Sequence, residues 1–214
     1  MKNIVVLVSG GGTNLQALID AQKSGDFTNG KISCVISSNP NAYALKRAET
    51  NNIDTAVIRR KDYDSQSEYD NALITLLESK KADLIVLAGF MTILGAEVIK
   101  AFENRIINIH PSLIPSFCGE GFYGLRVHEV ALSRGVKVTG ATAHFVNEVC
   151  DGGPIILQKA VEIKNDDTPE SLQKRVMEQA EWHILPQAVA LFCNDKIKVI
   201  DNKTTEILTW FWIR

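Results

Sequence analysis

The stretch Asp83-Leu84-Ile85-Val86-Leu87 decides the fold, because its four consecutive aliphatic residues do not alternate with polar ones. Such an uninterrupted run predicts a strand that is buried on both faces. Similar runs precede it, with helix-period segments between them. The expected strands cover residues 4–8, 32–36 and 55–58, and the expected helices begin near residues 14, 42 and 68. This order predicts an α/β fold with a Rossmann-like, mostly parallel sheet and helices on both faces.

The second half of the chain continues this pattern but changes the strand direction. The expected elements are a strand at 105–109, a helix at 124–134, and two alternating runs at 138–146 and 154–161. The short connection Asp151-Gly152-Gly153 between the last two predicts antiparallel strands toward the C-terminal half. Thr168 and Pro169 then begin a long helix, which we expect to break at Pro186.

The chain has 214 residues, of which 45% are hydrophobic and 22% charged. This composition favours one domain with one substantial core, which we assign to residues 1–200. The remaining tail, 201–214, is given no role. Two short strand-like runs occur within 196–214, and Trp210-Phe211-Trp212 is unusually apolar for a terminus, so an interface, a packed tail and a disordered end all remain open.

Charge and apolar runs exclude several partners. The formal net charge is −2 and Arg59-Arg60-Lys61 is the densest basic cluster, so we expect no nucleic acid and no anionic membrane as partner. The apolar run at 4–8 is too short for a signal-peptide core, and no run approaches the roughly 20 residues of a membrane span, so we expect a cytoplasmic protein. Scattered cysteines without a C-x-x-C pair favour reduced thiols and no metal: Cys34, Cys118, Cys150 and Cys193.

The segment Ser9-Gly10-Gly11-Gly12-Thr13-Asn14 follows the first expected strand and opens the first helix. Glycines let the backbone curl around a ligand, and Thr13, Asn14 and the free N–H groups of a helix start suit a phosphate. A tight turn with a cap is the alternative. Leu15 breaks the dinucleotide fingerprint, and Ser37-Ser38-Asn39 lacks the acidic ribose ligand. The loop therefore predicts a site for a single phosphomonoester.

Further candidate residues follow other strand ends. Phe90-Met91-Thr92-Ile93-Leu94 is apolar where a loop is normally polar, so it either walls a flat heterocycle or belongs to the core. Asn108 and His110 lie two residues apart, so an extended backbone directs both side chains to one face as a pair of hydrogen-bond donors. Asp151 either orients the histidine or is a simple turn residue. Together these residues predict acyl-group chemistry.

The other histidines and one glutamate have ordinary interpretations. We expect His128 on a solvated helix face, His144 in the core and His183 on an amphipathic helix. Glu181 lies near charged neighbours such as Arg175, where a surface salt-bridge ladder is the default interpretation.

With these residues in view, the sequence resembles the folate-dependent formyltransferases that act on glycinamide ribonucleotide in purine biosynthesis. The matching segments are the loop at 9–14, Ala-Gly-Phe-Met-x-Ile-Leu at 88–94, Asn-Ile-His-Pro-Ser-Leu-Ile-Pro at 108–115, His144-Phe145-Val146, and Asp-Gly-Gly-Pro-Ile-Ile-Leu-Gln at 151–158. The resemblance covers residues 1 to about 200 and implies the formyltransferase fold. It also implies 10-formyltetrahydrofolate as co-substrate, the ribonucleotide amine as acceptor and no metal, and it leaves a monomer and a homodimer open.

The resemblance implies roles for individual residues. The catalytic ones would be Asn108, His110 and Asp151. The ribonucleotide phosphate and ribose would bind Gly11, Gly12, Thr13, Asn14 and Glu181, and the folate would contact Phe90, Met91, Thr92, Ile93, Leu94, Asn108, Asn147, Glu148, Val149, Cys150 and Asp151. Gln66 and Thr92 are uncharged where some members carry a basic residue for the glutamate tail, and a substitute would come from Arg59, Arg60 or Lys61.

The expected reaction is attack of the amine on the formyl carbon, with Asn108 and His110 donating hydrogen bonds to the oxyanion. Asp151 is expected to raise the pKa of His110 above about 6.5, and to transfer a proton to the departing folate nitrogen through a water.

Three alternatives stay open, each with one feature against it. A methionyl-tRNA formyltransferase would carry a tRNA-binding domain and a basic surface. A formyltetrahydrofolate hydrolase usually has a further amino-terminal domain, whereas the first strand here begins near residue 3. A non-catalytic nucleotide-phosphate sensor would need none of Asn108, His110 and Asp151.

Overall fold

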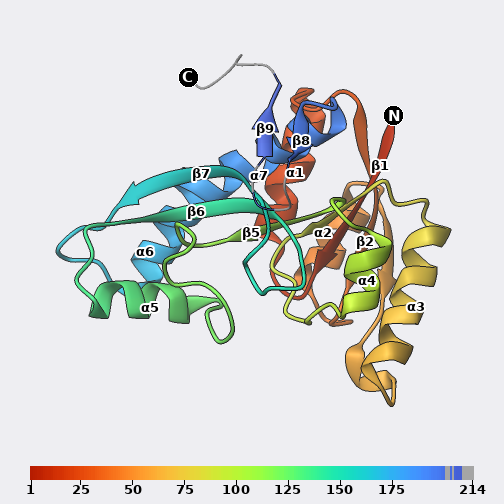
Figure 1. Ribbon diagram of the computed structural model, residues 1–214, viewed down its shortest axis with the longest axis horizontal. Helices are drawn as coiled ribbons and strands as arrows, with labels where there is room; N and C mark the ends of the chain where they lie inside the picture. The colour runs from red at the N-terminus through yellow and green to blue at the C-terminus, as the bar shows by residue number, and fades with distance from the viewer. Residues whose placement is uncertain (201–202, 204, 209–214) are drawn as a thin grey trace.

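A seven-stranded sheet with the order β3-β2-β1-β4-β5-β6-β7 forms the centre of the computed structural model, which describes residues 1–200, 203 and 205–208 (Figure 1). The strands are β1 (Lys2–Val8), β2 (Gly30–Ser37), β3 (Asp54–Val57), β4 (Leu84–Leu87), β5 (Ile106–His110), β6 (Val138–Phe145) and β7 (Ile155–Glu162). The first five are parallel, and β6 is antiparallel to both β5 and β7. The predicted fold class is confirmed, including the antiparallel strands of the second half.

Helices cover both faces of this sheet. One face packs on α1 (Thr13–Ser24), α2 (Tyr43–Thr50), α6 (Pro169–Val176) and α7 (Trp182–Cys193), and the other on α3 (Gln66–Ser79) and α4 (Ala96–Ala101). A further helix, α5 (Leu125–Ser133), packs against α6. The sequence did not predict α4. The Asp70 carboxylate accepts from the N–H of Gly95 just before that helix, at 3.2 Å, so a contact with α3 rather than a local signal marks its start.

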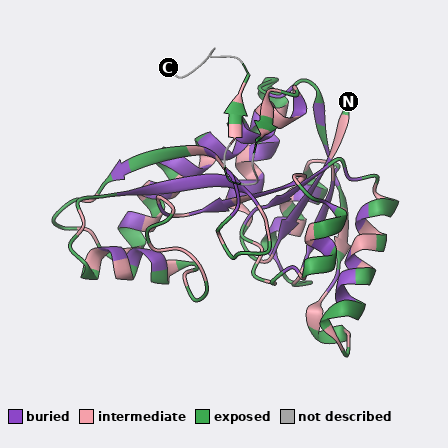
Figure 2. Ribbon diagram, viewed as in Figure 1, coloured by how far each residue is buried: buried purple, intermediate pink, exposed green. Residues whose placement is uncertain are grey.

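The continuous apolar runs arise because each central strand faces two cores. In β1, Ile4, Val6 and Val8 belong to the core under α1 and α7, while Val5 and Leu7 belong to the core under α3. Figure 2 shows β1 as buried beyond its first two residues, which are half-buried. Full burial of one such side chain stabilises the fold by about 1.5–3 kcal/mol, so residues 4–8 and 84–87 are aliphatic at every position.

The helix that begins after Thr168 does not break at Pro186, which corrects our expectation. It is interrupted one turn earlier by a π turn, η2 (Met177–Glu181), and Pro186 lies buried inside α7. At about 100° per residue, Leu172 and Ala188 would point about 160° apart on a straight α-helix. The extra residue of a π turn reduces this angle to about 60°. Both side chains therefore stay in the same core, and this packing outweighs the hydrogen bond lost at the proline.

Two short strands at the C-terminal end, β8 (Ile197–Val199) and β9 (Thr205–Ile207), pair antiparallel, as the two strand-like runs predicted. Before α3 there is one 3-10 turn, η1 (Arg60–Asp62). Trp210-Phe211-Trp212 lies outside the described residues. Within the described part of the chain, no helix has the length and apolar character needed to cross a membrane.

Candidate active site

The loops after β1 and β4 meet where the strand order reverses, the usual position of a ligand crevice in such sheets. Ser9 Oγ accepts a hydrogen bond from the backbone N–H of Met91 at 2.8 Å and lies 2.6 Å from Ser38 Oγ. The structure thus joins the glycine loop to the apolar segment 90–94.

The glycine loop is held in shape by α2. Gly12 has φ 74° and caps α1, and a Cβ built on it would lie 2.6 Å from Ala44 Cβ. The guanidinium of Arg47 donates to the carbonyl of Gly11 at 2.8 Å. Because Thr13 is the first helical residue, the first N–H groups of α1 have no partner within the helix and are arranged to meet an anion.

Glu181 is buried beside Asn14 and is not part of a surface ladder, which corrects the default interpretation. Asn14 Nδ2 donates to Glu181 Oε2 at 2.6 Å, while Arg175 pairs with Asp167. Burial raises the pKa of Glu181 to about 7, against the smaller opposing effect of the Asn14 hydrogen bond. Asn14 Oδ1 is buried with no hydrogen-bond partner among the described residues, so the pair has an acceptor left for a ligand hydroxyl.

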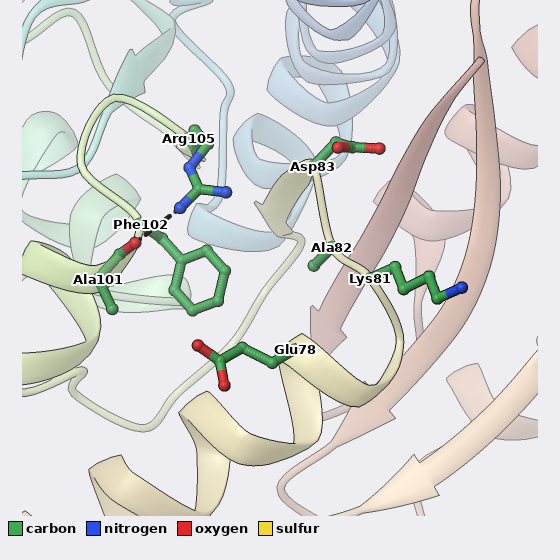
Figure 3. A pocket seen from close by; sticks show the side chains of 7 residues that line it. All are labelled: Glu78, Lys81, Ala82, Asp83, Ala101, Phe102 and Arg105. Atoms are coloured by element: carbon green, nitrogen blue, oxygen red, sulfur yellow. Dashed lines mark hydrogen bonds between the residues drawn. The ribbon is translucent and has the colours of Figure 1, made fainter.

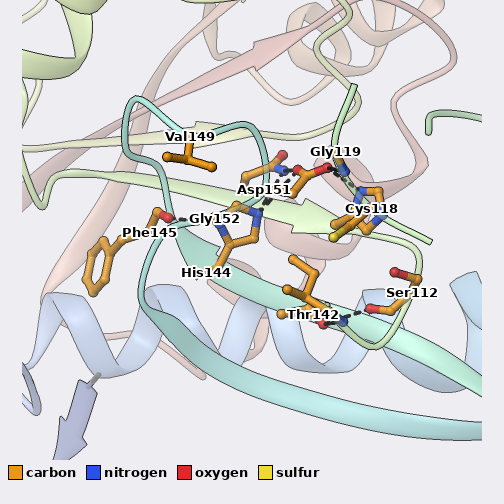
Figure 4. A network of polar contacts seen from close by, with 12 residues as sticks. Ser112, Cys118, Gly119, Thr142, His144, Phe145, Val149, Asp151 and Gly152 are labelled. Atoms are coloured by element: carbon orange, nitrogen blue, oxygen red, sulfur yellow. Dashed lines mark hydrogen bonds and ion pairs between the residues drawn. The ribbon is translucent and has the colours of Figure 1, made fainter. Parts of the chain in front are cut away.

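Asn108 and His110 share a face of β5, as the two-residue spacing predicted, because Ile107 and Ile109 fill the core on the other side. Asp151 comes from the turn after β6 (Figure 4), and its carboxylate lies near both of them. Its Oδ1 lies 3.5 Å from Asn108 Nδ2, and its Oδ2 lies 3.4 Å from His110 Nδ1. Three side chains from two distant segments therefore meet in one partly buried cluster.

The expected rise in the pKa of His110 is wrong. Burial lowers this pKa below 6.5, and it outweighs the opposing effects of the Asp151 charge and of the Phe117 carbonyl, which lies 2.9 Å from Nε2. The prediction counted the carboxylate but not the loop after β5, which covers the ring and leaves it 4% exposed. At neutral pH the imidazole is consequently uncharged.

Asp151 stays ionised. Burial by itself raises its pKa, but the neighbouring His144 and His110 and the backbone N–H of Gly119 together lower it below the ordinary value of 3.8. The Gly119 hydrogen bond to Oδ2 measures 2.9 Å. The turn requires Gly153 nearby, because a Cβ there would lie 1.8 Å from the carbonyl oxygen of Phe145.

The other three histidines, His128, His144 and His183, differ in burial and in their contacts. His144 is buried as expected, yet its Nε2 lies 3.1 Å from Asn108 Nδ2, a contact that its place in an alternating strand did not reveal. His128 is fully buried, not solvated, and neither ring nitrogen has a partner among the described residues, which corrects the expectation. Burial lowers its pKa to about 4. His183 is exposed on α7.

The segments expected to enclose a flat ring leave apolar side chains open at this end of the sheet. Met91 is 54% exposed, Ile93 79% and Val149 65%, while Leu94 is buried in the core beneath them. The segment 90–94 is therefore both a wall and a piece of core, so each of the two interpretations describes part of it.

Arg60 places a positive charge near the segment 90–94, through its contact with Gln66. Gln66 Nε2 contacts the carbonyl of Ile93 at 3.4 Å, and Arg60 Nε donates to Gln66 Oε1 at 2.9 Å. Arg59 instead pairs with Asp62. Of the three basic residues that we considered, Arg60 is the one that contacts Gln66.

A shallow hollow lies at the opposite edge of the sheet, at the amino ends of β4 and β5 (Figure 3). It is lined by Glu78, Lys81, Ala82, Asp83, Ala101, Phe102 and Arg105. The Arg105 guanidinium is occupied by the Ala101 carbonyl, at 2.7 Å, and by the Phe102 ring. The hollow lies away from every predicted site residue, so we place the chemistry at the other edge.

The four cysteines are free thiols. Across residues 1–200, 203 and 205–208, no group of three or more His, Cys, Asp and Glu side chains could hold a metal ion.

Comparison with known proteins gives the family. The formyl transferase model matches residues 2–189. A phosphoribosylglycinamide formyltransferase from Haemophilus influenzae is 44% identical over 202 residues, 94% of this chain and 92% of that protein. A glycinamide ribonucleotide transformylase structure from Symbiobacterium toebii matches with TM-score 0.91 and 40% identity, over 98% of this chain and 95% of that one. A formyltetrahydrofolate deformylase structure from Pseudomonas syringae matches with TM-score 0.85 and 28% identity, over 97% of this chain and 66% of that one. The chain therefore belongs to the formyl transferase family, within its phosphoribosylglycinamide formyltransferases.

Proposed function

We propose that this enzyme transfers the formyl group of 10-formyltetrahydrofolate to the amine of phosphoribosylglycinamide, giving formylglycinamide ribonucleotide and tetrahydrofolate in purine biosynthesis. The observation that carries the mechanism is the cluster of Asn108, His110 and Asp151, in which the Asp151 carboxylate lies 3.5 Å from Asn108 Nδ2 and 3.4 Å from His110 Nδ1. Its two donors and one ionised carboxylate suit acyl transfer to an amine.

The ribonucleotide binds at the β1–α1 end. Its phosphate lies on Gly11, Gly12, Thr13 and Asn14, where the first N–H groups of α1 have no partner within the helix. Its ribose hydroxyls donate to Glu181 and to the unpartnered Asn14 Oδ1. This arrangement directs the glycine amine toward β5.

The folate ring lies against Phe90, Met91, Thr92, Ile93 and Leu94 on one side and Asn147, Glu148, Val149, Cys150 and Asp151 on the other. The exposure of Met91, Ile93 and Val149 supports this position, because apolar side chains left open to water gain from covering a flat heterocycle. The hydrogen bond from Met91 to Ser9 sets this wall beside the phosphate loop.

The amine attacks the formyl carbon directly. The developing oxyanion accepts hydrogen bonds from Asn108 Nδ2 and from the neutral His110 ring, where the substrate oxygen takes the place of the Phe117 carbonyl at Nε2. The ionised Asp151 accepts a proton from the attacking amine through a water, and that proton passes to the departing folate nitrogen. The bond from the formyl carbon to the amine forms first, which gives a tetrahedral species, and the bond to the folate nitrogen breaks when that species collapses and the carbonyl re-forms.

Absorbance of released tetrahydrofolate, measured with and without the ribonucleotide, tests the proposal. We expect release that depends on the ribonucleotide, and a loss in kcat on the order of 10²–10³ for Asn108→Ala and for His110→Ala with folate binding retained. Asn14→Ala should mainly raise the KM for the ribonucleotide. The exposed His183→Ala is the control for histidine loss. Normal turnover by His110→Ala would remove that residue from the catalytic cluster.

The likeness to a deformylase structure favours one second candidate, hydrolysis of the formyl-folate. In that reaction water replaces the amine as nucleophile, and the same assay separates the two. Release without the ribonucleotide supports the hydrolase, whereas binding of both ligands without release supports a sensor.

We also propose that residues 1–200 act as one formyltransferase domain on small molecules, in the cytoplasm, as a monomer or a homodimer. Sedimentation of the full chain with and without both substrates distinguishes the two assembly states.

A further inference from the structure

His144 stands directly opposite Asn108 in the antiparallel ladder of β5 and β6. Residues paired in this way have adjacent side chains on the same face of the sheet. The two side chains make a contact of 3.1 Å between His144 Nε2 and Asn108 Nδ2, and His144 is 1% exposed. The backbone register thus delivers a buried imidazole to the amide of a proposed catalytic residue.

The second ring nitrogen fixes the direction of this hydrogen bond. His144 Nδ1 lies 2.8 Å from the carbonyl oxygen of Phe145, which can only accept, so Nδ1 carries the hydrogen (Figure 4). In the neutral ring Nε2 then has a lone pair and accepts from Asn108 Nδ2. Asp151 Oδ1 lies 3.7 Å from Nε2, beyond hydrogen-bond distance, and as an ionised carboxylate it has no hydrogen to donate, so Asn108 Nδ2 is the donor to Nε2.

This hydrogen bond determines which end of the Asn108 amide faces the substrate. One N–H of Nδ2 is held by His144, and the other points toward Asp151 Oδ1 at a long 3.5 Å, where an oxyanion can compete for it. Without the acceptor on His144, the amide is free to rotate by 180°. Its carbonyl oxygen would then face the developing negative charge and repel it.

We propose that His144 is a positioning residue, which acts through Asn108 by keeping the amide N–H turned toward the formyl oxygen. This inference rests on the proposed function, because it assumes that Asn108 donates to the oxyanion. A histidine that merely filled the core would contribute equally whether or not Asn108 were present.

A double-mutant cycle on kcat tests the proposal with the full chain. His144→Leu fills the buried position with an apolar side chain of similar size but removes the acceptor. We expect kcat to fall roughly 10- to 100-fold, which does not exceed the loss of about 10²–10³ for removing an oxyanion donor outright. The KM for each substrate should change by less than about twofold. In the Asn108→Ala background, His144→Leu should cause no further loss. His144→Gln, whose side-chain oxygen can accept in the place of Nε2, should recover most of the rate.

Thr139→Val is the matched control, because Thr139 lies buried on the same strand with no partner for its hydroxyl among the described residues. Equal losses from His144→Leu in both backgrounds would overturn the inference alone. Normal turnover by Asn108→Ala would instead remove the proposed oxyanion donor, and the inference with it. Should His144→Leu fail to fold, ¹⁵N spectra of the unmodified protein still decide: hydrogen on Nδ1 supports the proposal, and hydrogen on Nε2 overturns it.

Discussion

The two ends of the proposed site are built in different ways. At the β1–α1 end, the main contributors are backbone groups of six consecutive residues, 9–14, shaped by Gly12 and by the start of a helix. At the β5–β6 end, side chains from separate segments make the cluster, and Asp151 has the left-handed φ of 54°. The proposed phosphate site thus consists mainly of backbone groups that α2 holds in shape, whereas the proposed acyl-transfer site consists of side chains whose protonation depends on what covers them.

This difference is tested most strongly at Asp151, where we expect the largest effect. Asp151→Asn preserves the shape and the hydrogen bond from Gly119 but removes the proton acceptor, so kcat should fall on the order of 10³. That loss corresponds to about 4 kcal/mol of barrier. Turnover assays give kcat, and titration of folate should show retained binding. The exposed Asp166→Asn is the control for the same chemical change. A loss smaller than tenfold would contradict a role in proton transfer.

The second largest effect is expected at Glu181, at the β1–α1 end of the site, and it concerns the stability of the fold. The pKa of Glu181 is raised from 4.5 to about 7, so between these pH values the folded state keeps a proton that the unfolded state has released. The free energy of unfolding therefore falls as pH rises through this window, by roughly 3 kcal/mol in total. Glu181→Gln lacks this loss and should be more stable than the unmodified protein at pH 8, while binding the ribonucleotide less tightly.

Urea unfolding of both proteins at pH 4.5 and pH 8 measures that difference. An identical pH dependence in the two proteins would show that the carboxyl does not titrate in this window. Ionisation of Glu181 would then carry no cost in stability at the β1–α1 end of the site.

Gly12→Ala is expected to have a smaller effect, which probes the backbone of the phosphate end. The new Cβ would meet Ala44 at 2.6 Å, and φ 74° is unfavourable for alanine, so we expect a loss of about 2 kcal/mol in the free energy of unfolding. Gly10→Ala is the control, because a Cβ there meets no described atom within 4 Å, and it should change stability by less than about 0.5 kcal/mol. Equal losses for both variants would mean that the loop is not shaped by its contact with α2.

Local patterns were enough to predict much of this molecule. The two-residue spacing of Asn108 and His110 fixes their common face because strand geometry has a period of two, and the run at 84–87 indicates a doubly buried strand because both faces carry helices. The glycine motif at 9–14 is equally visible in the local sequence, although its contact with α2 is not. Each of these predictions depends on neighbours along the chain, which the sequence displays directly.

The features that sequence did not predict depend on neighbours across space. The lowered pKa of His110 requires the loop around Phe117 to cover the ring, and the burial of Glu181 requires the π turn to direct it toward Asn14. His144 is distinguished from a core histidine only by its register opposite Asn108. A strand pairing or a helix irregularity of this kind leaves no periodic signal in the residues themselves.

The smallest effect is expected at Arg60, beside the exposed apolar segment 90–94. Arg60 contacts Gln66 beside the apolar wall, so it can attract the carboxylates of a folate glutamate tail in place of a basic residue at position 66 or 92. An exposed pair contributes about 0.2–1 kcal/mol, so Arg60→Ala should raise the KM for a polyglutamylated folate about two- to fivefold and leave kcat unchanged. Arg59→Ala, which removes the pair with Asp62 and no other side-chain hydrogen bond or ion pair among the described residues, is the control. The increase should shrink in high salt, since exposed charges are screened, and an equal increase for the monoglutamate would mean that Arg60 supports the wall and does not bind the tail.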